Sequence, residues 1–348
     1  MSLRNWTRCI AACAGLAVLA AACGGGAVTP STGSSQGSAA SSSSPEVASL
    51  NVAIYNGSAV SLPAWVAEQE GFFKKQDLDV HLTSVASSDA AVAALLSKSV
   101  DIMLNATEIV METRAKGQDI KMVAGNTVRL PWILIARKDL PTKGSSFPED
   151  MQGLIGKRIG VTALGTSSQF FAEALLRNAN VDPSKVTILG VGFAATGLPA
   201  LQNGTIDAYL TTDPGATVAV EVQHTAQTLV DTRKGEGGPL FSNWPYNGYE
   251  ARTSDIVAKP GVFKRFNDAM AAAQSWMHDS ANFDAVVSIL AAQMNEPVAT
   301  ARLVAQSNLA TFGNDLPKAG VDNVSKFLVQ YRLLEQPAKY DDVVYQFK

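Results

Sequence analysis

Cysteine is scarce in this 348-residue sequence, and its few copies lie close together near the beginning. They are Cys9, Cys13 and Cys23, so the rest of the chain contains no thiol. This absence excludes a disulfide framework, a cysteine nucleophile and a thiolate metal site from the main body of the protein.

Histidine is equally rare, and charge of one sign does not accumulate. The three histidines, His81, His224 and His278, are scattered, and none has a second ligand at metal-binding spacing. We therefore expect structural or exposed histidines, no metal and no cofactor. The formal net charge is −3 at pH 7, and no basic run or basic patch interleaved with aromatics occurs. Nucleic acid is therefore an unfavourable partner.

The amino terminus lacks an apolar run long enough to span a bilayer, but it has the layout of an export signal. Arg4 and Arg8 precede an apolar run from Ile10 to Ala22, which falls short of the roughly 20 residues that a membrane-spanning helix needs. Small residues end the run before Cys23, as at a signal cleavage site. We predict a signal peptide over residues 1–22.

The segment after this run predicts a tether. The layout resembles a bacterial lipoprotein signal with Cys23 as the lipidated residue, although the position three before it is Ala20 rather than the usual larger aliphatic residue. Residues 24–45 are rich in Gly, Ser and Thr and nearly free of aliphatics, so 23–47 is predicted to be a flexible linker. The expected location is the extracytoplasmic face of a membrane, periplasmic or outer, with plain secretion as the alternative.

The most informative stretch runs from Gly156 to Asn180. Lys157–Val161 predicts a short strand, a loop with a glycine follows, and from Phe170 apolar residues recur at helical spacing. Thr166 begins a Thr-Ser-Ser run at the predicted helix start. There a hydroxyl can cap the helix while spare backbone N–H groups lie at the positive end of its dipole.

Such a helix start suits a carboxylate, sulfonate or phosphate. The alternative is an ordinary Ser/Thr cap whose free N–H groups bind water.

The sequence also contains an internal repeat. A shift of roughly 106 positions places Leu50–Pro63 on Gly156–Gln169 and continues without a gap for about fifty residues. Ala94–Ile102 falls on Ala200–Ala208, which predicts a helix end, a turn and a buried strand in each copy. Each copy therefore predicts a β-α-β-α-β lobe, and the facing strand-to-helix loops would form a cleft.

The resulting fold prediction is α/β, with two α/β lobes joined by two crossing strands around a central cleft. We expect crossings near 132–137 and 247–252, which would allow hinge closure on a ligand. Lobe 1 would comprise 48–131 and 250–348, and lobe 2 would comprise 132–249. Helices are predicted at 262–278, 282–294, 297–309 and 321–334.

A series of motifs carries a family resemblance over about residues 48–280. The motifs are LPAWVAEQEGFFKKQDLDV from Leu62, then ALLSKSVDI, AKGQDIKMVAG, GLIGKRIGV with GTSS, and ALQNGTIDAYLTTDP. Together they resemble the nitrate, alkanesulfonate and thiamine-precursor group of ABC-transporter substrate-binding proteins, which have the type II periplasmic-binding-protein fold. The resemblance implies a monomeric protein that passes a small solute to an ABC permease and its ATPase.

The resemblance also implies which positions contact the ligand. They come from the first loop, the end of the third strand and the helix-start turn: Asn56, Gly57, Ser58, Ala106, Thr107, Gly165, Thr166, Ser167 and Ser168. The group often has Glu-Pro where this chain has Asp213-Pro214. Asp213 would accept from a ligand amine or hydroxyl, or cap the next helix ahead of Pro214.

Aromatic residues cluster near the predicted crossings. Trp132, Trp244, Tyr246 and Tyr249 would stack on a flat substrate or pack the hinge. Trp244 and Tyr246 flank Pro245 in a loop and are the stronger candidates for ligand contact, and Trp132 is included with them.

Enzyme motifs are incomplete. Gly165–Gln169 lacks the second glycine of a nucleophile elbow, and Gly190–Gly192 lacks the third glycine of a dinucleotide loop. A pyrimidine-synthesising enzyme shares the fold that the resemblance implies, but its cysteine-rich motif has no counterpart here. We predict a non-enzymatic lipoprotein that binds a small anionic nutrient, aromatic or sulfonated. The alternatives are a secreted enzyme acting on a pyrimidine-like or organic-acid substrate and a sensory or adhesive lipoprotein.

Overall fold

The computed structural model describes residues 47–141 and 147–347, apart from the side chains of residues 240 and 242. The predicted signal peptide, Cys23 and nearly all of the predicted linker lie outside the described residues. Within the described ranges, no helix combines the length and apolar character that a membrane span requires.

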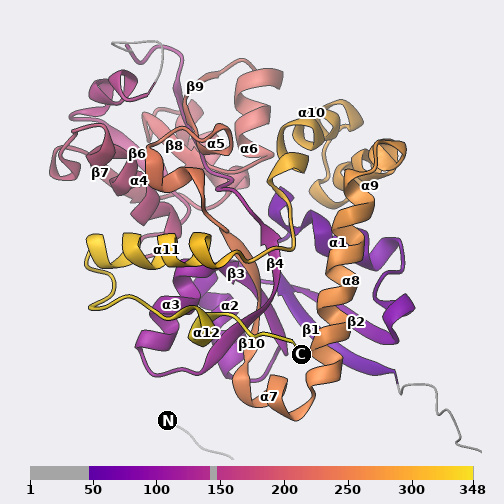
Figure 1. The fold of residues 1–348 in the computed structure, drawn as a ribbon. Helices are drawn as coiled ribbons and strands as arrows, with labels where there is room; N and C mark the ends of the chain where they lie inside the picture. Colours follow the sequence, from indigo (N-terminus) through magenta and orange to yellow (C-terminus); the bar gives the residue numbers. More distant parts are fainter. Residues whose placement is uncertain (1–46, 142–146, 348) are drawn as a thin grey trace, which may run out of the picture. The chain divides into compact units, whose positions relative to one another are not determined.

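The first sheet has five strands, four of which run in the same direction (Figure 1). In order across the sheet they are β2 (Leu78–Ser84), β1 (Ala48–Ile54), β3 (Ile102–Ala106), β10 (Asn247–Arg252) and β4 (Ile120–Thr127). β1 pairs in parallel with β2 and β3, whereas β10 runs antiparallel between β3 and β4. Every residue of β3 is buried, as expected for a strand covered on both faces.

The second sheet repeats this arrangement. Its order is β7 (Thr187–Gly190), β6 (Arg158–Val161), β8 (Ala208–Thr211), β5 (Ile133–Arg137) and β9 (Ala226–Asp231). β6 is parallel to β7 and β8, and β5 lies antiparallel between β8 and β9. The chain passes into this sheet with β5 and returns to the first with β10. The predicted fold class is confirmed, and the limits proposed for each lobe stay a prediction.

One detail of the predicted repeat is wrong. Val52 of β1 pairs with Ile102 of β3, and Ile159 of β6 pairs with Ala208 of β8. Between the third strands, β3 and β8, the equivalent residues are separated by the predicted number of positions. Between the first strands, β1 and β6, they are separated by one position more. A one-residue shift exchanges the two faces of a strand, and Val52 and Ile159 are both fully buried.

Helices cover both sheets. Those that follow strands of the first sheet are α1 (Leu62–Gln69), α2 (Ser88–Leu96), α3 (Thr107–Ala115) and α7 (Thr253–Ala258). Those of the second are α4 (Ser167–Asn178), α5 (Ala194–Gln202) and α6 (Gly215–Thr217). The carboxyl-terminal part adds α8 (Pro260–His278), α9 (Phe283–Met294), α10 (Val298–Asn308), α11 (Lys318–Gln330) and α12 (Tyr340–Val343). The first four of these helices correspond to the four predicted segments, and α12 was not predicted.

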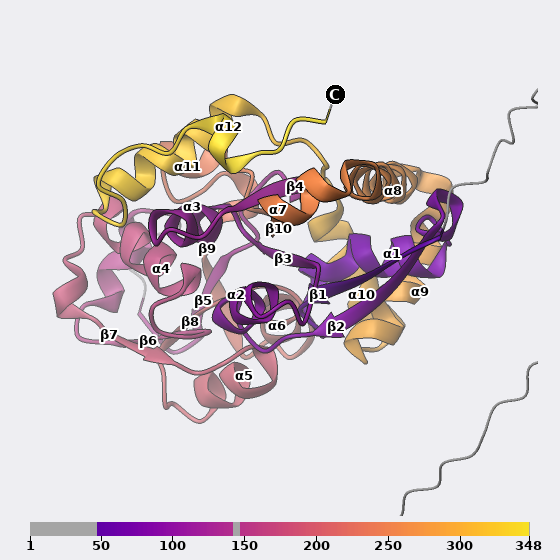
Figure 2. The ribbon, with the colours of Figure 1, turned by 90° about the horizontal axis from the view of Figure 1, so that it is seen from below.

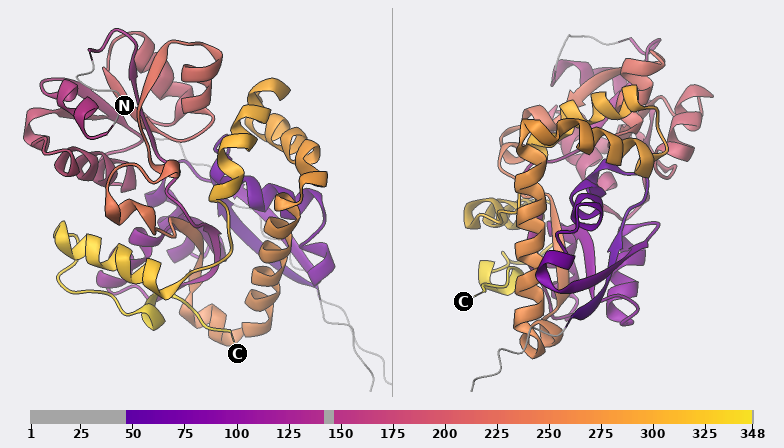
Figure 3. Two further views of the ribbon diagram at one scale, coloured as in Figure 1. Left: turned by 45° about the horizontal axis from the view of Figure 1, so that its top comes forward. Right: turned by 90° about the vertical axis from the view of Figure 1, so that its right-hand side faces the viewer.

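The long helix α8 illustrates how sequence spacing positions the core. Pro260 occupies its first turn, where a missing N–H costs nothing. Phe263, Phe266, Met270 and Met277 recur on one face and are buried. That face packs on α1 and β4, and Figure 3 shows α8 in orange along one side of the first sheet.

A second core is shared by both lobes and contains a cluster of aromatic rings. Phe171 of α4 has its ring centroid 5.3 Å from that of Trp244, and Trp244 lies 4.9 Å from Phe327 of α11. α11 packs in turn on α3 of the first lobe, and Figure 2 shows α11 and α12 beside α3. The two lobes are therefore in contact through a buried aromatic cluster behind the site described next.

Candidate functional site

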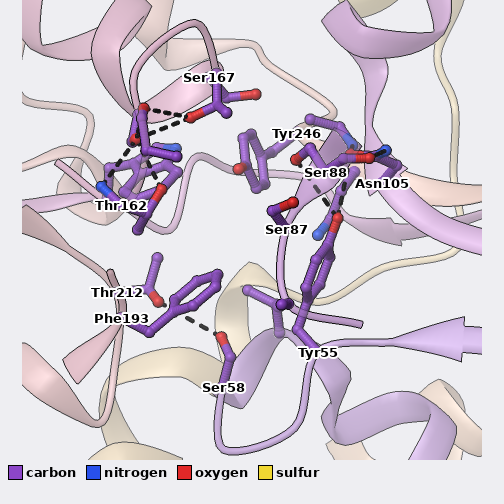
Figure 4. A pocket seen from close by; sticks show the side chains of 18 of the residues that line it. Tyr55, Ser58, Ser87, Ser88, Asn105, Thr162, Ser167, Phe193, Thr212 and Tyr246 are labelled. Carbon is purple, nitrogen blue, oxygen red and sulfur yellow. Dashed lines mark hydrogen bonds between the residues drawn. The ribbon is translucent and has the colours of Figure 1, made fainter. Parts of the chain in front are cut away.

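A pocket lies where loops from the carboxyl ends of both sheets meet (Figure 4). It leaves about 70 Å³ for a bound molecule, several times the roughly 10–15 Å³ that one water needs. The first-lobe lining residues are Tyr55, Ser58, Val60, Ala86, Ser87, Ser88, Asn105 and Ala106. The remaining lining residues are Trp132, Thr162, Ala163, Thr166, Ser167, Ser168, Gly192, Phe193, Thr212, Tyr246 and Asn247.

None of these lining residues carries a formal charge at pH 7. Polarity comes instead from hydroxyl, amide and indole groups and from helix N-termini, because α2, α4 and α5 all begin at or beside lining residues. The positive ends of several helix dipoles therefore face one small space. Such a lining offers donors to a ligand without supplying a counter-cation.

The start of α4 is the most donor-rich part of the wall. Thr166 precedes the helix in extended conformation, but its side chain does not cap it. Its hydroxyl donates to the carbonyl of Ala163 (2.9 Å), while Ser168 Oγ accepts from the N–H of Thr162 (3.1 Å). The predicted hydroxyl cap is thus wrong, because these hydroxyls stabilise the preceding loop. The backbone N–H groups of Thr166, Ser167 and Ser168 donate to no described residue.

Three further donors lie together beside this helix start. The indole N–H of Trp132 and the hydroxyl of Ser167 are buried and have no partner among the described residues. The Tyr246 hydroxyl lies next to both, and burial holds its pKa well above the ordinary value. Figure 4 shows Ser167 and Tyr246 on the same side of the pocket. The phenol is therefore neutral, and the donors of Trp132 and Ser167 beside it have no acceptor among the described residues.

Aromatic rings from both lobes form another part of the wall. The centroids of Tyr55 and Phe193 are 6.2 Å apart, with the rings tilted by 44°. The Tyr55 hydroxyl donates to Asn105 Oδ1 (3.3 Å), and burial raises the pKa of this phenol. These rings supply apolar surface for a flat part of a ligand.

Direct contacts between the lobes close the rim. Ser58 Oγ lies 3.5 Å from Thr212 Oγ1, and the N–H of Ala59 donates to the carbonyl of Asp213 (3.2 Å). The Asp213 side chain does not line the pocket. Its Oδ2 accepts from Arg233 and from the Asn308 amide, both at 2.6 Å.

Asp213 Oδ1 also accepts from the N–H of Thr217 (2.9 Å). These hydrogen bonds favour the capping alternative for Asp213, and a ligand contact at this residue stays a prediction. Both carboxylate oxygens of Asp213 therefore accept hydrogen bonds from the protein. Oδ1 accepts from a backbone N–H of α6, and Oδ2 links the end of β8 to α10.

The other predicted ligand contacts divide into two groups. Those that line the pocket are Ser58, Ala106, Trp132, Thr166, Ser167, Ser168 and Tyr246. Those that do not are Asn56, Gly57, Thr107, Gly165, Asp213 and Trp244. Asn56, Gly57 and Gly165 are exposed on the loops, Thr107 donates its hydroxyl to the Pro245 carbonyl (2.7 Å), and Trp244 is buried in the aromatic cluster.

Several lining residues were missed, although the repeat contained a signal for them. The missed residues are Tyr55, Val60, Ala86, Ser87, Ser88, Asn105, Thr162, Ala163, Gly192, Phe193, Thr212 and Asn247. Ala86 and Gly192 occupy equivalent places in the two copies, as do Ala106 and Thr212. Extending the repeat to its second and third loops would have added Ala86, Gly192 and Thr212 to the predicted Ala106.

Residues 58–281 match the family model described as NMT1/THI5 like. The chain belongs to the NMT1/THI5-like family. This family match agrees with the resemblance inferred from the motifs.

Known relatives place this family membership in context. "Putative binding protein YtlA" of Bacillus subtilis (strain 168) is 26% identical over 223 residues, which are 62% of each protein. The yeast 4-amino-5-hydroxymethyl-2-methylpyrimidine phosphate synthase THI11 of Saccharomyces cerevisiae (strain ATCC 204508 / S288c) is 25% identical over 161 residues, 43% of this chain and 45% of the synthase. The match thus spans less than two thirds of either relative.

Solved structures agree on the fold. The periplasmic aliphatic sulphonate binding protein SsuA of Escherichia coli superposes with a TM-score of 0.70 and 16% identity, covering 87% of this chain and 98% of SsuA. The two-lobed architecture is therefore that of periplasmic binding proteins.

Proposed function

We propose that this protein is an extracytoplasmic solute-binding protein of an ABC importer, which captures a small anionic nutrient between its two lobes. The observation that carries the proposal is the start of α4, where three backbone N–H groups lie beside the Ser167 hydroxyl and none of these donors has a described acceptor. A buried donor that lacks a partner is costly. A ligand that supplies acceptors would satisfy them.

The size and lining of the pocket narrow the ligand class. About 70 Å³ of space suits a molecule of a few to about ten heavy atoms, given the volume that each water takes. Tyr55 and Phe193 favour a flat apolar part, and the neutral lining favours an anion with delocalised charge, such as an aromatic carboxylate or sulfonate. Helix N-termini without a cation stabilise an anion by up to about 2 kcal/mol each.

Comparison with the synthase relative supports a second candidate, an enzyme of the same fold. The pocket lining described above contains no histidine, cysteine or carboxylate. His278 instead lies against the Phe312 carbonyl, with Nε2 3.2 Å from its oxygen, and His81 and His224 are exposed. General acid–base chemistry would therefore depend on Ser, Thr or Tyr alone. This lining favours binding without turnover.

The proposal also covers how the protein is attached to the membrane and which transporter subunits it meets there. Cys23, which the sequence marks for lipidation, would hold the monomeric protein at the extracytoplasmic face of the membrane. There it would deliver solute to the permease and its ATPase. Replacing Cys23 with Ala should release the protein into the medium or periplasm, as measured by membrane fractionation. Retention at the membrane would contradict the lipid anchor.

A thermal-shift screen tests the ligand class. The compounds are benzoate, benzenesulfonate and nitrate, with neutral benzamide as the shape-matched control. A ligand at 100 times its dissociation constant adds about 2.7 kcal/mol to the free energy of unfolding. We expect benzoate or benzenesulfonate to raise the melting temperature more than benzamide does. Stabilisation by benzamide alone would contradict the anion assignment, and product formation in the same mixtures would indicate an enzyme.

A further inference from the structure

A buried carboxyl group lies behind the donor-rich wall of the pocket. Glu108 is in the first turn of α3, its residue is 2% exposed, and neither carboxyl oxygen has a hydrogen-bond partner among the described residues. Buried polar groups are nearly always paired, and an unpaired carboxylate is especially costly. The position of Glu108 therefore requires an explanation.

Two other unpaired groups face this carboxyl. They are the hydroxyl of Ser167 and the indole N–H of Trp244, which are buried without described partners of their own. Ser167 also lines the pocket, whereas Glu108 and Trp244 do not. The Ser167 hydroxyl therefore connects the buried acid in the first lobe with the ligand space at the start of α4.

The surroundings of Glu108 disfavour its charged form. Ionisable groups nearby are Glu112 on α3, Glu250 on β10, Tyr55 after β1, Tyr246 before β10 and Asp89 on α2. α11 packs on α3, but its Lys318 and Lys326 are exposed and its Asp322 is half-buried. Burial raises the pKa of Glu108 to about 8, although the Ser167 hydroxyl lowers it in part. The carboxyl is thus mostly protonated at pH 7.

We propose that Glu108 is a positioning residue whose proton directs the Ser167 hydroxyl toward an anionic ligand. The proposal rests on the proposed function, because it assigns selectivity to the same pocket. With Glu108 protonated, its O–H donates to Ser167 Oγ, and the Ser167 O–H is donated into the pocket. The remaining carboxyl oxygen accepts from the Trp244 indole N–H.

When Glu108 loses its proton, the direction of the hydrogen bond between Glu108 and Ser167 reverses. The carboxylate then accepts from both the Ser167 hydroxyl and the Trp244 indole, so Ser167 presents only lone pairs to the pocket. A negative charge also remains close to any bound anion. The pocket would therefore discriminate against anions when Glu108 is ionised, even though Glu108 does not touch the ligand.

The sign of the pH dependence follows from the raised pKa. A group whose pKa is raised in the closed, ligand-bound form favours that form while it is protonated. Anion affinity should be greatest at low pH and fall as the pH rises through about 8. Glu108 has one pKa in the open form and a higher one in the closed form. At pH values between these two, anion affinity should fall by nearly tenfold per pH unit, and one proton is taken up for each anion bound.

Calorimetry with benzoate tests this linkage. Titrations of the wild-type protein, Glu108→Gln and Glu112→Gln at pH 6, 7, 8 and 9 are repeated in two buffers of different ionisation enthalpy. Wild type should lose at least tenfold in affinity between pH 6 and pH 9 and should take up protons on binding. Glu108→Gln should lose both effects, because its amide donates to Ser167 and accepts from Trp244 at every pH.

Glu112→Gln is the matched control. Glu112 lies one turn further along α3, and burial raises its pKa to about 7, but it does not face Ser167. This variant should keep the loss of affinity and the proton uptake, displaced to lower pH because the Glu112 charge helps to raise the pKa of Glu108, and neutral benzamide should show little pH dependence with any of the proteins. A Glu108→Gln variant that keeps the wild-type pH profile would overturn the proposal, as would one that is folded but binds benzoate at no pH.

A ligand-free measurement separates this inference from the proposed ligand class. Ser58→Cys with Thr212→Cys, in a Cys23→Ala background, should lock the lobes closed by a disulfide, since the native side-chain oxygens are 3.5 Å apart. Infrared spectra of the locked protein should show a protonated carboxyl that titrates near pH 8 and disappears in Glu108→Gln. Its presence without benzoate binding would contradict only the ligand class, whereas its absence would overturn the role of Glu108.

Discussion

The loop after β1 and the loop after β6 occupy equivalent places in the two lobes, yet their backbone N–H groups differ in their hydrogen-bond partners. In each, a serine hydroxyl accepts from the N–H of the residue that follows the strand. Ser61 accepts from Tyr55, and Ser168 accepts from Thr162, both at 3.1 Å. This shared hydrogen bond fixes which residues of the two loops correspond.

The residues just before those serines differ between the lobes. In the first lobe Ala59 donates its N–H to the Asp213 carbonyl, and apolar Val60 faces the pocket. In the second lobe the equivalent positions are Thr166 and Ser167, whose N–H groups have no described acceptor. The first-lobe loop therefore contacts the other lobe, and the second-lobe loop leaves these N–H groups without a described acceptor.

This difference teaches that a repeated fold need not repeat its chemistry. The helices that follow the two loops both present positive dipole ends to the same space, but of the two only α4 has a buried side-chain hydroxyl, that of Ser167, without a partner among the described residues. Changes in the second-lobe loop should therefore affect ligand binding, and changes around the first-lobe loop should affect closure.

The largest effect should come from a negative charge in the donor loop. Ser167→Asp places a carboxylate at the start of α4, where it accepts from the free N–H groups and repels an anion. We expect benzoate affinity to fall at least a hundredfold, since like-charge juxtaposition costs several kcal/mol. Isothermal titration calorimetry measures the change.

Ser254→Asp is the control for this prediction. It adds the same charge to an exposed position in the first turn of α7, away from the pocket lining. It should bind benzoate like wild type. Unchanged affinity in Ser167→Asp would remove the anion site from the start of α4.

A smaller effect should follow from weakening the closure contact. Asn308→Ala removes an amide that donates to the buried Asp213 carboxylate, whose backbone carbonyl binds the first-lobe loop. A hydrogen bond to a charged group contributes about 1.5–3 kcal/mol, so affinity should fall roughly ten- to a hundredfold. Stopped-flow kinetics should show faster dissociation with little change in the association rate.

Ser307→Ala provides the comparison for Asn308→Ala. Its hydroxyl lies 3.2 Å from the same carboxylate but also lies 3.0 Å from the Leu303 carbonyl. Loss of the Ser307 hydroxyl should therefore weaken ligand binding less than loss of the Asn308 amide does. Equal effects of both variants, or none from Asn308→Ala, would mean that this contact does not govern closure.

The fold was largely predictable because repetition and hydrophobic periodicity are properties of the chain itself. The one-residue error arose where a uniform shift was applied across the first helix. Buried Leu50, Val52 and Ile54 alternate along β1, and Ile159 and Val161 alternate along β6. Matching these alternations rather than counting positions would have given the observed register.

The site was less predictable because it forms where eight separate segments of the chain meet. Gly192 and Ala86 carry no chemistry of their own, so nothing local marks them as lining residues. Trp244 has the flanking residues of an exposed loop, yet its ring is fully buried between α4 and α11. Whether an aromatic ring points to ligand or to core depends on packing that spacing does not encode.

The smallest expected effect concerns a hydrogen bond that occurs in both lobes, from a backbone N–H to an aspartate carboxylate. Asp101 accepts from the N–H of Asn51, and Asp207 accepts from the N–H of Arg158, each at 2.9 Å. In the second lobe the Arg158 guanidinium makes two contacts of 3.0 Å with the Asp207 carboxylate, whereas in the first lobe the Arg252 guanidinium lies 3.8 Å from the Asp101 carboxylate. Asp207→Asn should therefore lower the free energy of unfolding more than Asp101→Asn, by about 0.5–1 kcal/mol for a half-exposed pair.

The pH dependence of this last difference follows from the lowered pKa of Asp207, whose largest cause is its hydrogen bond with Arg158. A lowered pKa stabilises the fold above the unfolded-state value, near pH 4, and that stability is lost as the pH falls further. Urea unfolding should show the difference between the two variants at pH 7 and little of it at pH 2. Equal losses at pH 7 would show that the arginine adds no stability, and that the two lobes differ in their binding loops but not in this part of their framework.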